Sequence, residues 1–513
     1  MTKKTAIDRE TTILLALLAG WSILLAFANI RNPLWLDEVI AVNFAQKPFM
    51  ETMRMIFHDN WLPLHLIYLD AWMFFFGSSD ISLRLSALLI YFLNIFSIYY
   101  IAGKLFKNKY AGFYSAVFFA ASVLAVRHSS NIKAYGILAL ITNWSVFYFV
   151  KIFIEKSKSR AHTAAYIILN VFGTFTHYWF IFALISQGVL SLVFGFRKWK
   201  KAIMLHAAAA LPFIIIWSGA LINRLSEGGV TSWVGFYHNE INRTLDFFTY
   251  GAVKRFLAIF IIPFAAAVIY DLVKKKPVKQ TVNAYIRLIK EPKIVYFAAF
   301  FILPLIFAYY FSMLLQPVFV PERGPLMVAG AFSIILGAPL AVLVKRRFAV
   351  PFLVIFMALI YFSFYAGKAP RDHLLKETTK NMAETIQEQD LVLFAGLHRA
   401  PVQYYLKKYN IPESAANSWI AVVLKDEEVG AEEKQVHIKD WEAEISPRIT
   451  EATKSGGDVW FSTGKRENLK KINIRVKSRL GKRFKEKNEY SFNNREIIIY
   501  SDEKIDDDFM KKE

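Results

Sequence analysis

The sequence predicts an α-helical polytopic membrane protein with a C-terminal α/β domain. The chain has 513 residues, of which 55% are hydrophobic, and its mean hydropathy is +0.33. Apolar runs long enough to cross a bilayer recur along residues 1–366. After residue 366, polar helical patterns alternate with short apolar strands, which is typical of an α/β domain. We therefore expect a transmembrane domain over 1–366 and a second domain over 367–513.

About eleven segments are expected to span the membrane, because a transmembrane helix needs about 20 predominantly apolar residues. The first run is long for the apolar core of a signal peptide and lacks a small-residue cleavage site, so we expect it to be retained. The expected spans lie near residues 12–30, 83–103, 111–127, 134–154, 161–176, 178–196, 202–222, 254–272, 294–315, 325–344 and 349–366.

The basic residues predict the orientation of the chain. Residues 1–366 contain 35 Lys and Arg against 15 Asp and Glu, whereas residues 367–513 contain 27 against 26. The excess lies in short loops that alternate with loops poor in Lys and Arg, which places the basic loops in the cytoplasm and argues against nucleic-acid binding. We expect a multi-pass protein of the plasma (inner) membrane with a cytoplasmic N-terminus and an extracytoplasmic C-terminal domain. The basic loops contain Lys3, Lys4 and Arg9; Lys104, Lys107 and Lys109; Lys151, Lys156, Lys158 and Arg160; Arg197, Lys198, Lys200 and Lys201; Lys274, Lys275, Lys276 and Lys279; and Lys345, Arg346 and Arg347.

Three loops on the expected external side contain polar residues of interest. The first, residues 31–82, includes a short apolar stretch at 63–76 that suits a helix lying at the membrane interface better than a span. The second, residues 223–253, contains Trp233, Tyr237, His238 and Asp246, and the third, residues 316–324, contains Glu322 and Arg323. The acidic and histidine residues of the first loop are Asp37, Glu38, Glu51, His58, Asp59, His65, Asp70 and Asp80.

The C-terminal domain is expected to contain a partly parallel sheet, because short apolar strands follow polar helices along the chain. The expected helices are 372–388, 399–408 and 465–480, and the expected strands are 391–396, 459–463 and 496–500. Gly456-Gly457 is a turn signal, and no glycine-rich phosphate loop is present in this part of the sequence. The chain has no cysteine, which excludes disulfides and thiolate-bound metals.

Asp37 and Glu38 are the first candidates for chemistry, because they follow the first span by a few residues. Carboxylates near the membrane surface are costly to desolvate, and such a group can serve as a general base. Taken alone, the pair fits two solvated loop acids better. The surrounding sequence reverses that preference.

The ordered motifs of residues 20–200 resemble the bacterial protein-mannosyltransferase-like glycosyltransferases of the GT-C superfamily, which include the lipid A aminoarabinose transferases. The family pattern has Asp-Glu after the first span, a Pro-Leu-aromatic segment before a Phe-Gly turn, Leu-Arg-Leu at the second span, a basic-x-Tyr after the third and Thr-His-Tyr near the fifth. The matching segments are NPLWLDEV, NWLPLHLIYLDAWMFFFGSSDISLRLSALL, RHSSNIKAYGILAL and GTFTHYWFIFAL, with a weaker match at VPERGP.

The resemblance implies transfer of a sugar from a polyprenyl-phosphate donor to an acceptor on the external face, which is lipid A or lipopolysaccharide, another envelope glycan, or a protein. It implies that Asp37 is the general base, with Glu38 beside it. Cations should stabilise the leaving phosphate. The residues assigned to donor or substrate binding on this basis are Lys133 and Tyr135 of the basic-x-Tyr, Arg323, Arg84 and His177.

The sequence departs from the family at three places. Trp61-Leu62-Pro63 stands where many members have His-Pro-Pro, and nearby His58-Asp59 is a candidate replacement in substrate binding. Asn131 stands where many members have an acid, and Lys133 stands where Arg is usual. These departures leave a second acidic partner and a metal open. No metal site or other cofactor is assigned, although His58, His65, His238 and the carboxylates could hold a divalent ion.

Two other functions fit parts of the sequence. A transporter or flippase of lipid-linked sugars would place ionisable residues near the membrane midplane and often shows internal repeats. The expected spans here are almost free of charge and no repeat is visible. A non-catalytic envelope assembly protein would use the C-terminal domain as its interaction module. Loss of transfer in an Asp37→Ala variant would favour the enzyme over both.

Overall fold

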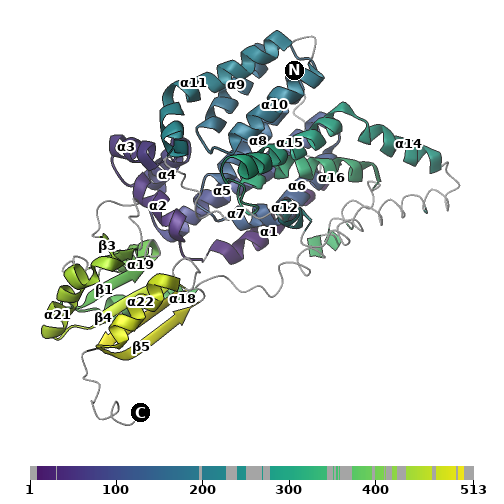
Figure 1. Ribbon diagram of the computed structural model, residues 1–513. Helices are drawn as coiled ribbons and strands as arrows, with labels where there is room; N and C mark the ends of the chain where they lie inside the picture. The colour runs from purple at the N-terminus through teal and green to yellow at the C-terminus, as the bar shows by residue number, and fades with distance from the viewer. Residues whose placement is uncertain are drawn as a thin grey trace. The chain divides into compact units, whose positions relative to one another are not determined.

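The computed structural model describes most of both predicted domains (Figure 1). It describes residues 9–30, 32–59, 61–195, 199–226, 240–249, 278–343, 373–395, 399–409, 419–423, 435–464, 470–492 and 495–501, together with residues 269 and 411 and a few of 351–358. The chain divides into two compact units. We call residues 1–30 with 44–369 the helical unit, and residues 31–43 with 370–513 the α/β unit.

Helices account for nearly all of the described part of the helical unit. In chain order these are α1 (Arg9–Ile30), α3 (Phe49–Asp59), α4 (Pro63–Phe76), α5 (Asp80–Phe106), α6 (Lys109–Ala121), α7 (Val123–His128), α8 (Tyr135–Phe149) with its π-helical extension η1 (Val150–Ile154), α9 (Arg160–Thr174), α10 (Phe180–Phe194), α11 (Trp199–Ser226), α12 (Glu240–Phe248), α14 (Val278–Ile289), α15 (Pro292–Leu314), the 3-10 helix η4 (Gly324–Val328) and α16 (Ala329–Leu343).

Membrane-spanning helices are confirmed as the main feature of this unit. Among the described residues, six helices are long and apolar enough to cross a membrane, and α4 and α10 are shorter apolar helices. The six segments are Glu10–Phe27, Asp80–Phe106, Tyr135–Ile154, Trp199–Ile222, Pro292–Leu314 and Gly324–Ala341. The expected span at 254–272 and most of that at 349–366 lie outside the described residues.

Three expected spans are shorter or interrupted in the structure. The span expected at 111–127 is two helices, α6 and α7, because Ser122 adopts an extended conformation with ψ 130°. The spans expected at 161–176 and 178–196 are α9 and α10, of 15 residues each, separated by a turn. Their apolar sequences continue through that turn, so hydropathy alone does not reveal where the helices end.

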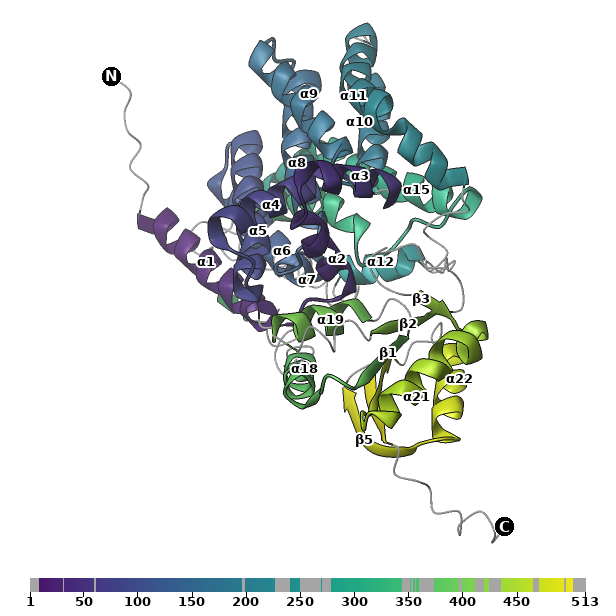
Figure 2. The same ribbon diagram turned by 90° about the vertical axis from the view of Figure 1, so that its left-hand side faces the viewer.

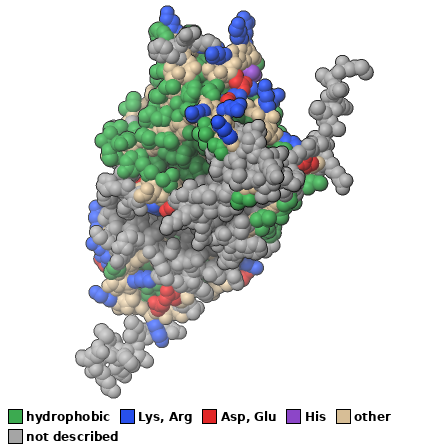
Figure 3. Space-filling model, turned by 90° about the vertical axis from the view of Figure 1, so that its right-hand side faces the viewer, with side chains coloured by type: hydrophobic (Ala, Val, Ile, Leu, Met, Phe, Trp, Pro, Cys, Tyr) green, Lys and Arg blue, Asp and Glu red, His purple; other side chains and the backbone are tan. Residues whose placement is uncertain are grey.

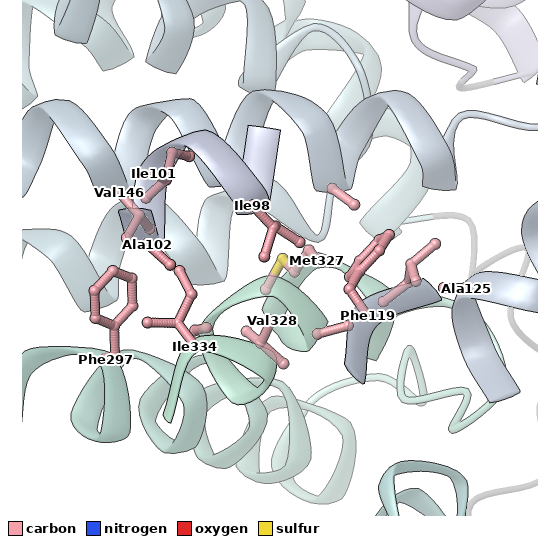
Figure 4. Close-up of a cluster of buried hydrophobic side chains, with 14 of the residues drawn as sticks. Ile98, Ile101, Ala102, Phe119, Ala125, Val146, Phe297, Met327, Val328 and Ile334 are labelled. Carbon is pink, nitrogen blue, oxygen red and sulfur yellow. The ribbon is translucent and has the colours of Figure 1, made fainter. Parts of the chain in front are cut away.

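Helix α6 forms the centre of the helical unit, where it packs against both α5 and α16. Glycines make this close approach possible. A Cβ at Gly112 of α6 would lie 2.4 Å from the Tyr99 carbonyl oxygen, and a Cβ at Gly337 of α16 would lie 2.2 Å from the Ser115 backbone nitrogen. Figure 4 shows the buried side chains around this contact, among them Ile98, Phe119, Met327 and Ile334.

Hydrophobic side chains also cover the outside of the helical unit. In the upper part of Figure 3, hydrophobic side chains form a broad green area on the described surface, with Lys and Arg side chains above it and to its right. An apolar surface this large indicates contact with lipid. On α5, exposed residues recur at helical spacing along one side, at Ile81, Leu85, Leu89, Leu93, Phe96 and Tyr100.

Helix α4 is confirmed as a short apolar helix that ends where the sequence predicted. Gly77 follows it with φ 75°, a left-handed conformation that glycine adopts without strain. The Tyr68 hydroxyl donates to the Ser86 carbonyl at 2.9 Å, and the Trp72 indole N–H donates to the Ser82 carbonyl at 3.0 Å. These bonds fix α4 against α5.

The α/β unit contains a six-stranded mixed sheet in the order β3-β2-β1-β4-β6-β5. Strands β3, β2, β1 and β4 are parallel, and β6 and β5 are antiparallel to their neighbours. Helices cover both faces, with α18 and α19 on one and α21 and α22 on the other (Figure 2). The elements are α18 (His373–Thr385), β1 (Leu391–Ala395), α19 (Arg399–Lys408), β2 (Ile420–Val423), β3 (Gln435–His437), η8 (Ile438–Asp440), η9 (Trp441–Ile445), α21 (Ser446–Lys454), β4 (Val459–Gly464), α22 (Lys470–Gly481), β5 (Lys485–Phe492) and β6 (Arg495–Ser501).

The expected partly parallel sheet is therefore confirmed, with three strands that the sequence analysis did not predict. β2 and β3 are very short, and β5 has the polar sequence KEKNEYSF, which suits an edge strand. Residues 31–43 also group with this unit rather than with the helical unit to which we assigned them. The reason is a buried contact, because the Leu34 backbone N–H donates to the Tyr405 hydroxyl at 2.8 Å.

Candidate functional site

Lys133 lies in a fixed turn between α7 and α8. The Asn131 backbone N–H donates to the His128 carbonyl at 3.3 Å, and the Lys133 N–H donates to the Asn131 carbonyl at 2.9 Å. Arg84, buried in α5, donates to the Ser130 carbonyl and so ties the turn to a neighbouring helix. Lys133 therefore stands just before the N-terminus of α8, where the helix dipole also favours an anion.

The Lys133 side chain contacts an aromatic ring. Its Nζ lies 3.5 Å from the centroid of the Trp61 ring, in a cation–π arrangement. Trp61 is in turn held by an edge contact with Phe44 at 5.3 Å between centroids and by its backbone N–H, which donates to the Ile56 carbonyl at 3.0 Å. Trp61, where the sequence departs from the pattern it resembles, thus contacts the Lys133 ammonium group.

Two histidines lie within electrostatic reach of Lys133. His65 is buried on α4, and His177 is half-buried in the turn between α9 and α10. Burial, and then the charge of Lys133, lowers the pKa of each, that of His177 to about 3. Both imidazoles are therefore neutral at pH 7. The Trp179 backbone N–H donates to His177 Nδ1 at 3.2 Å, so the Nε2 atom carries the ring proton.

Tyr135 connects His177 to a third histidine. Its ring centroid lies 5.1 Å from that of His177 and 4.9 Å from that of His128 at the end of α7. Burial lowers the pKa of His128 to about 4, although a hydrogen bond to the Glu322 carbonyl opposes the shift. His128 was not predicted from the sequence as a site residue. The feature that could have indicated it is its position at the polar end of an apolar run.

The loop before η4 brings Arg323 to the same end of the helical unit. The Glu322 carboxylate forms an ion pair with Arg127, and the Trp179 indole N–H donates to the Val318 carbonyl at 3.1 Å. The backbone passes so close to the Trp179 ring that a Cβ at Gly324 would lie 2.1 Å from it. The charge of Arg323 contributes to the lowered pKa of His177, so Arg323 lies within electrostatic reach of that imidazole.

A small cavity of about 10 Å³ lies beside Lys133. Its polar lining includes His65, His128, Asn131 and Lys133 from α4, α7 and the turn before α8. Its volume matches about one water molecule. The predicted residues Lys133, Tyr135, His177 and Arg323 are thus brought together with His65 and His128 at one end of the helical unit.

Asp37 and Glu38 lie in the α/β unit, in the first turn of α2 (Leu36–Ala45). The buried Glu38 carboxylate accepts the Trp35 backbone N–H at 3.1 Å, which is the reciprocal half of a capping box. This contact gives Glu38 a structural role. Asp37 is half-exposed beside it, at a helix N-terminus that favours a carboxylate.

The remaining predicted residues are placed less fully. His58 and Asp59 end α3, and their side chains lie outside the described residues, as do Trp233, Tyr237 and His238. Within the described part of the chain, no three His, Asp or Glu side chains converge as a metal site would require. A metal requirement therefore stays an open prediction.

Comparisons with known proteins identify the fold. No protein-family model and no curated protein matches the sequence. The crystal structure of ArnT from Cupriavidus metallidurans bound to undecaprenyl phosphate matches with a TM-score of 0.56 at 13% identity, covering 96% of this chain and 98% of that one. The apo state of the same protein matches with a TM-score of 0.49 at 13% identity over 96% and 97% of the two chains. The oligosaccharyltransferase of Archaeoglobus fulgidus in complex with Zn and sulfate matches with a TM-score of 0.45 at 13% identity over 95% and 73%.

Proposed function

On the premise that this chain has the GT-C fold, we propose that it is a membrane glycosyltransferase that takes a sugar from a polyprenyl-phosphate donor. The observation that carries the proposal is the position of Lys133, at the N-terminus of α8 and beside neutral histidines. The matched ArnT structure contains undecaprenyl phosphate, a ligand of the same chemical class.

Lys133 is proposed to bind the donor phosphate. When the bond between sugar and phosphate breaks, negative charge develops on the leaving phosphate, and a cation already in place lowers the barrier. His65 and His177 are neutral, so they offer hydrogen bonds without neutralising the lysine. Arg323, within electrostatic reach of His177, supplies a second charge. Tyr135 is proposed to position His177, and Arg84 to position the turn that carries Lys133.

Asp37 is proposed as the general base that takes the proton of the acceptor hydroxyl or amine. It is the half-exposed member of the pair, whereas the Glu38 carboxylate is occupied by the backbone of its own helix. A single positioned base contributes about 10²–10⁴-fold to a rate. His58 and Asp59 remain candidates for acceptor contacts.

The reaction is proposed to take place on the extracytoplasmic face of the plasma (inner) membrane. A polyprenyl donor is itself membrane-bound, so its phosphate must be met by residues that flank the spans. The lysine-rich loops alternate along the sequence with the loops that contain these residues, which favours a cytoplasmic location for the lysine-rich set. The acceptor is proposed to be lipid A or lipopolysaccharide, another envelope glycan, or a protein.

The test is transfer by the purified full-length chain in vesicles that contain undecaprenyl-phosphate-linked sugars. Asp37→Ala should lower transfer by at least about 10²-fold, while Glu51→Ala, which removes an exposed partner of Lys47, should leave it unchanged. Mass spectrometry of envelope lipids and glycans from cells with and without the protein names the sugar and the acceptor. Full transfer by Asp37→Ala would contradict the role of the base, and an unchanged envelope would contradict the enzyme.

A further inference from the structure

His128 has a lone pair that no described residue satisfies. The side chain is 6% exposed, and its Nε2 lies 2.8 Å from the Glu322 carbonyl oxygen. A carbonyl oxygen only accepts hydrogen bonds, so Nε2 carries the ring proton and Nδ1 is an acceptor. Within the described part of the chain, Nδ1 is buried and has no hydrogen-bond partner.

Asn131 presents a second acceptor of the same kind. Its Oδ1 is also buried without a partner among the described residues. His128 and Asn131 both line the cavity of about 10 Å³ beside Lys133. Buried polar atoms are nearly always hydrogen-bonded, so two unsatisfied acceptors around one cavity indicate a missing donor.

The surroundings define the chemistry of that donor. The charge of Lys133 reaches the cavity, since it contributes to the lowered pKa of His65 in the same lining, and it disfavours a bound cation. Two acceptor lone pairs disfavour an anion. The volume admits one group of the size of water. A neutral water, with two protons to donate, meets all three conditions, as does a single hydroxyl whose proton is shared between the two acceptors.

We propose that this cavity is a hydroxyl site, in which one water or one hydroxyl group donates to His128 Nδ1 and Asn131 Oδ1; a water does so with its two protons, and a hydroxyl shares its one proton between them. The O–H group belongs either to a resident water or to a hydroxyl of the donor sugar, and the second case rests on the proposed function. The site places a neutral contact next to the lysine that we assign to the phosphate. Asn131 is an amide, so it adds no charge to the site.

The test is a double-mutant cycle of His128→Phe, Asn131→Leu and their combination in the purified full-length chain. If both side chains hold the same group, the effects are not additive and the double variant equals His128→Phe alone. Asn131→Asp keeps an acceptor oxygen and should retain the site. Thr142→Val is the matched control, because it removes a buried hydroxyl that is already bonded to the Leu138 carbonyl.

Two measurements separate the sources of the O–H group. For a resident water, each single variant lowers the unfolding temperature by a few degrees without donor, non-additively, and lowers affinity equally for undecaprenyl phosphate and its sugar-linked form. For a sugar hydroxyl, affinity for the sugar-linked form falls about tenfold, which corresponds to about one hydrogen bond, while affinity for undecaprenyl phosphate alone is retained.

Additive effects in both measurements would overturn the hydroxyl site. So would a higher unfolding temperature of Asn131→Leu with unchanged sugar affinity, because that is the behaviour of a dry cavity being filled. The unfolding measurement requires no transferase activity. Failure of the proposed function would therefore appear as absent lipid-phosphate binding, separately from failure of the hydroxyl site.

Discussion

The two ends of α8 place their lysines in opposite settings. At its C-terminal end, Lys151 and Lys293 lie 2.6 Å and 3.0 Å from the Glu155 carboxylate, and Lys293 also donates to the Leu105 carbonyl. Just before its N-terminal end, Lys133 instead contacts the Trp61 ring and neighbours two neutral histidines. Lys133 and Lys151 are about 27 Å apart along the helix axis.

The comparison distinguishes lysines that stabilise the fold through ion pairs from the lysine that we propose binds a ligand. The two lysines that share the Glu155 carboxylate are held in ion pairs and mainly join helices. Lys133 lies beside an indole and neutral imidazoles, and we propose that the group it meets is the donor phosphate. The comparison can be tested at both ends of the helix.

The largest effect is expected for Lys133. Lys133→Met should lower transfer by about 10²–10³-fold, because it removes a cation from the developing phosphate charge. Lys133→Arg should retain part of the activity, since the charge remains. Lys151→Met is the control at the other end of the helix, where the lysine lies 2.6 Å from Glu155, and it should keep full transfer. Equal losses in both variants would show that the two ends do not differ in function.

The second prediction concerns pH. The lowered pKa of His128, about 4 against 6.5 for a free imidazole, means that the unfolded chain binds a proton first as the pH falls. The free energy of unfolding should therefore decrease between about pH 6.5 and pH 4, by on the order of 2–3 kcal/mol for this residue.

The carboxylate end should respond in a different pH window. Burial alone would raise the pKa of Glu155, but its hydrogen bonds from Lys151 and Lys293 lower it. Its contribution to stability is complete above the unfolded pKa of 4.5 and is lost as the pH falls below it.

Chemical denaturation of the purified chain at a series of pH values should show the loss of stability assigned to His128 in the wild type and a smaller loss in His128→Phe. An unchanged slope between pH 6.5 and 4.5 in that variant would refute the assignment.

A smaller effect is expected for Trp61. Trp61→Leu removes the cation–π contact and should cost about 1 kcal/mol in the interaction with Lys133. Donor affinity should change through the position of the ammonium group, and Trp61→Phe should restore much of it. A KM that changes in Trp61→Leu with a nearly constant kcat would locate the effect in binding. Identical donor affinities of the Trp61→Leu and Trp61→Phe variants would exclude a role for the aromatic ring.

The smallest effect is expected where Lys109 meets Glu10. Breaking this half-exposed pair with Glu10→Gln should change the free energy of unfolding by at most about 1 kcal/mol. The Tyr110 hydroxyl, which donates to the same carboxylate at 2.7 Å, should still donate to the amide oxygen. A loss of several kcal/mol, measured by denaturation at low and high salt, would show that this ion pair contributes more to stability than we expect.

The fold was largely predictable because its signals are local. Apolar length identified the helices that contain Asp80–Phe106 and Pro292–Leu314, and strand patterns identified β1, β4 and β6. The break at Ser122 and the short strand β3 were not predictable, since neither changes the apolar pattern enough.

The site was predictable only in part. The motif order brought out Lys133, Tyr135 and His177, which the structure indeed gathers at one end. It did not reveal His128, whose importance depends on a carbonyl 194 residues further along the chain. The motif also places Asp37 and Glu38 together, although the hydrogen bond that Glu38 accepts from the Trp35 backbone N–H gives Glu38 a structural role.

The hydrogen bond between Leu34 and Tyr405 has a consequence for biosynthesis. These residues are 371 positions apart, and both are buried. During translation, the segment that leads into Asp37 emerges early, yet its partner is made only after every membrane helix described above. The surroundings of Asp37 are therefore completed last, so a nascent or truncated chain presents this carboxylate without its final setting.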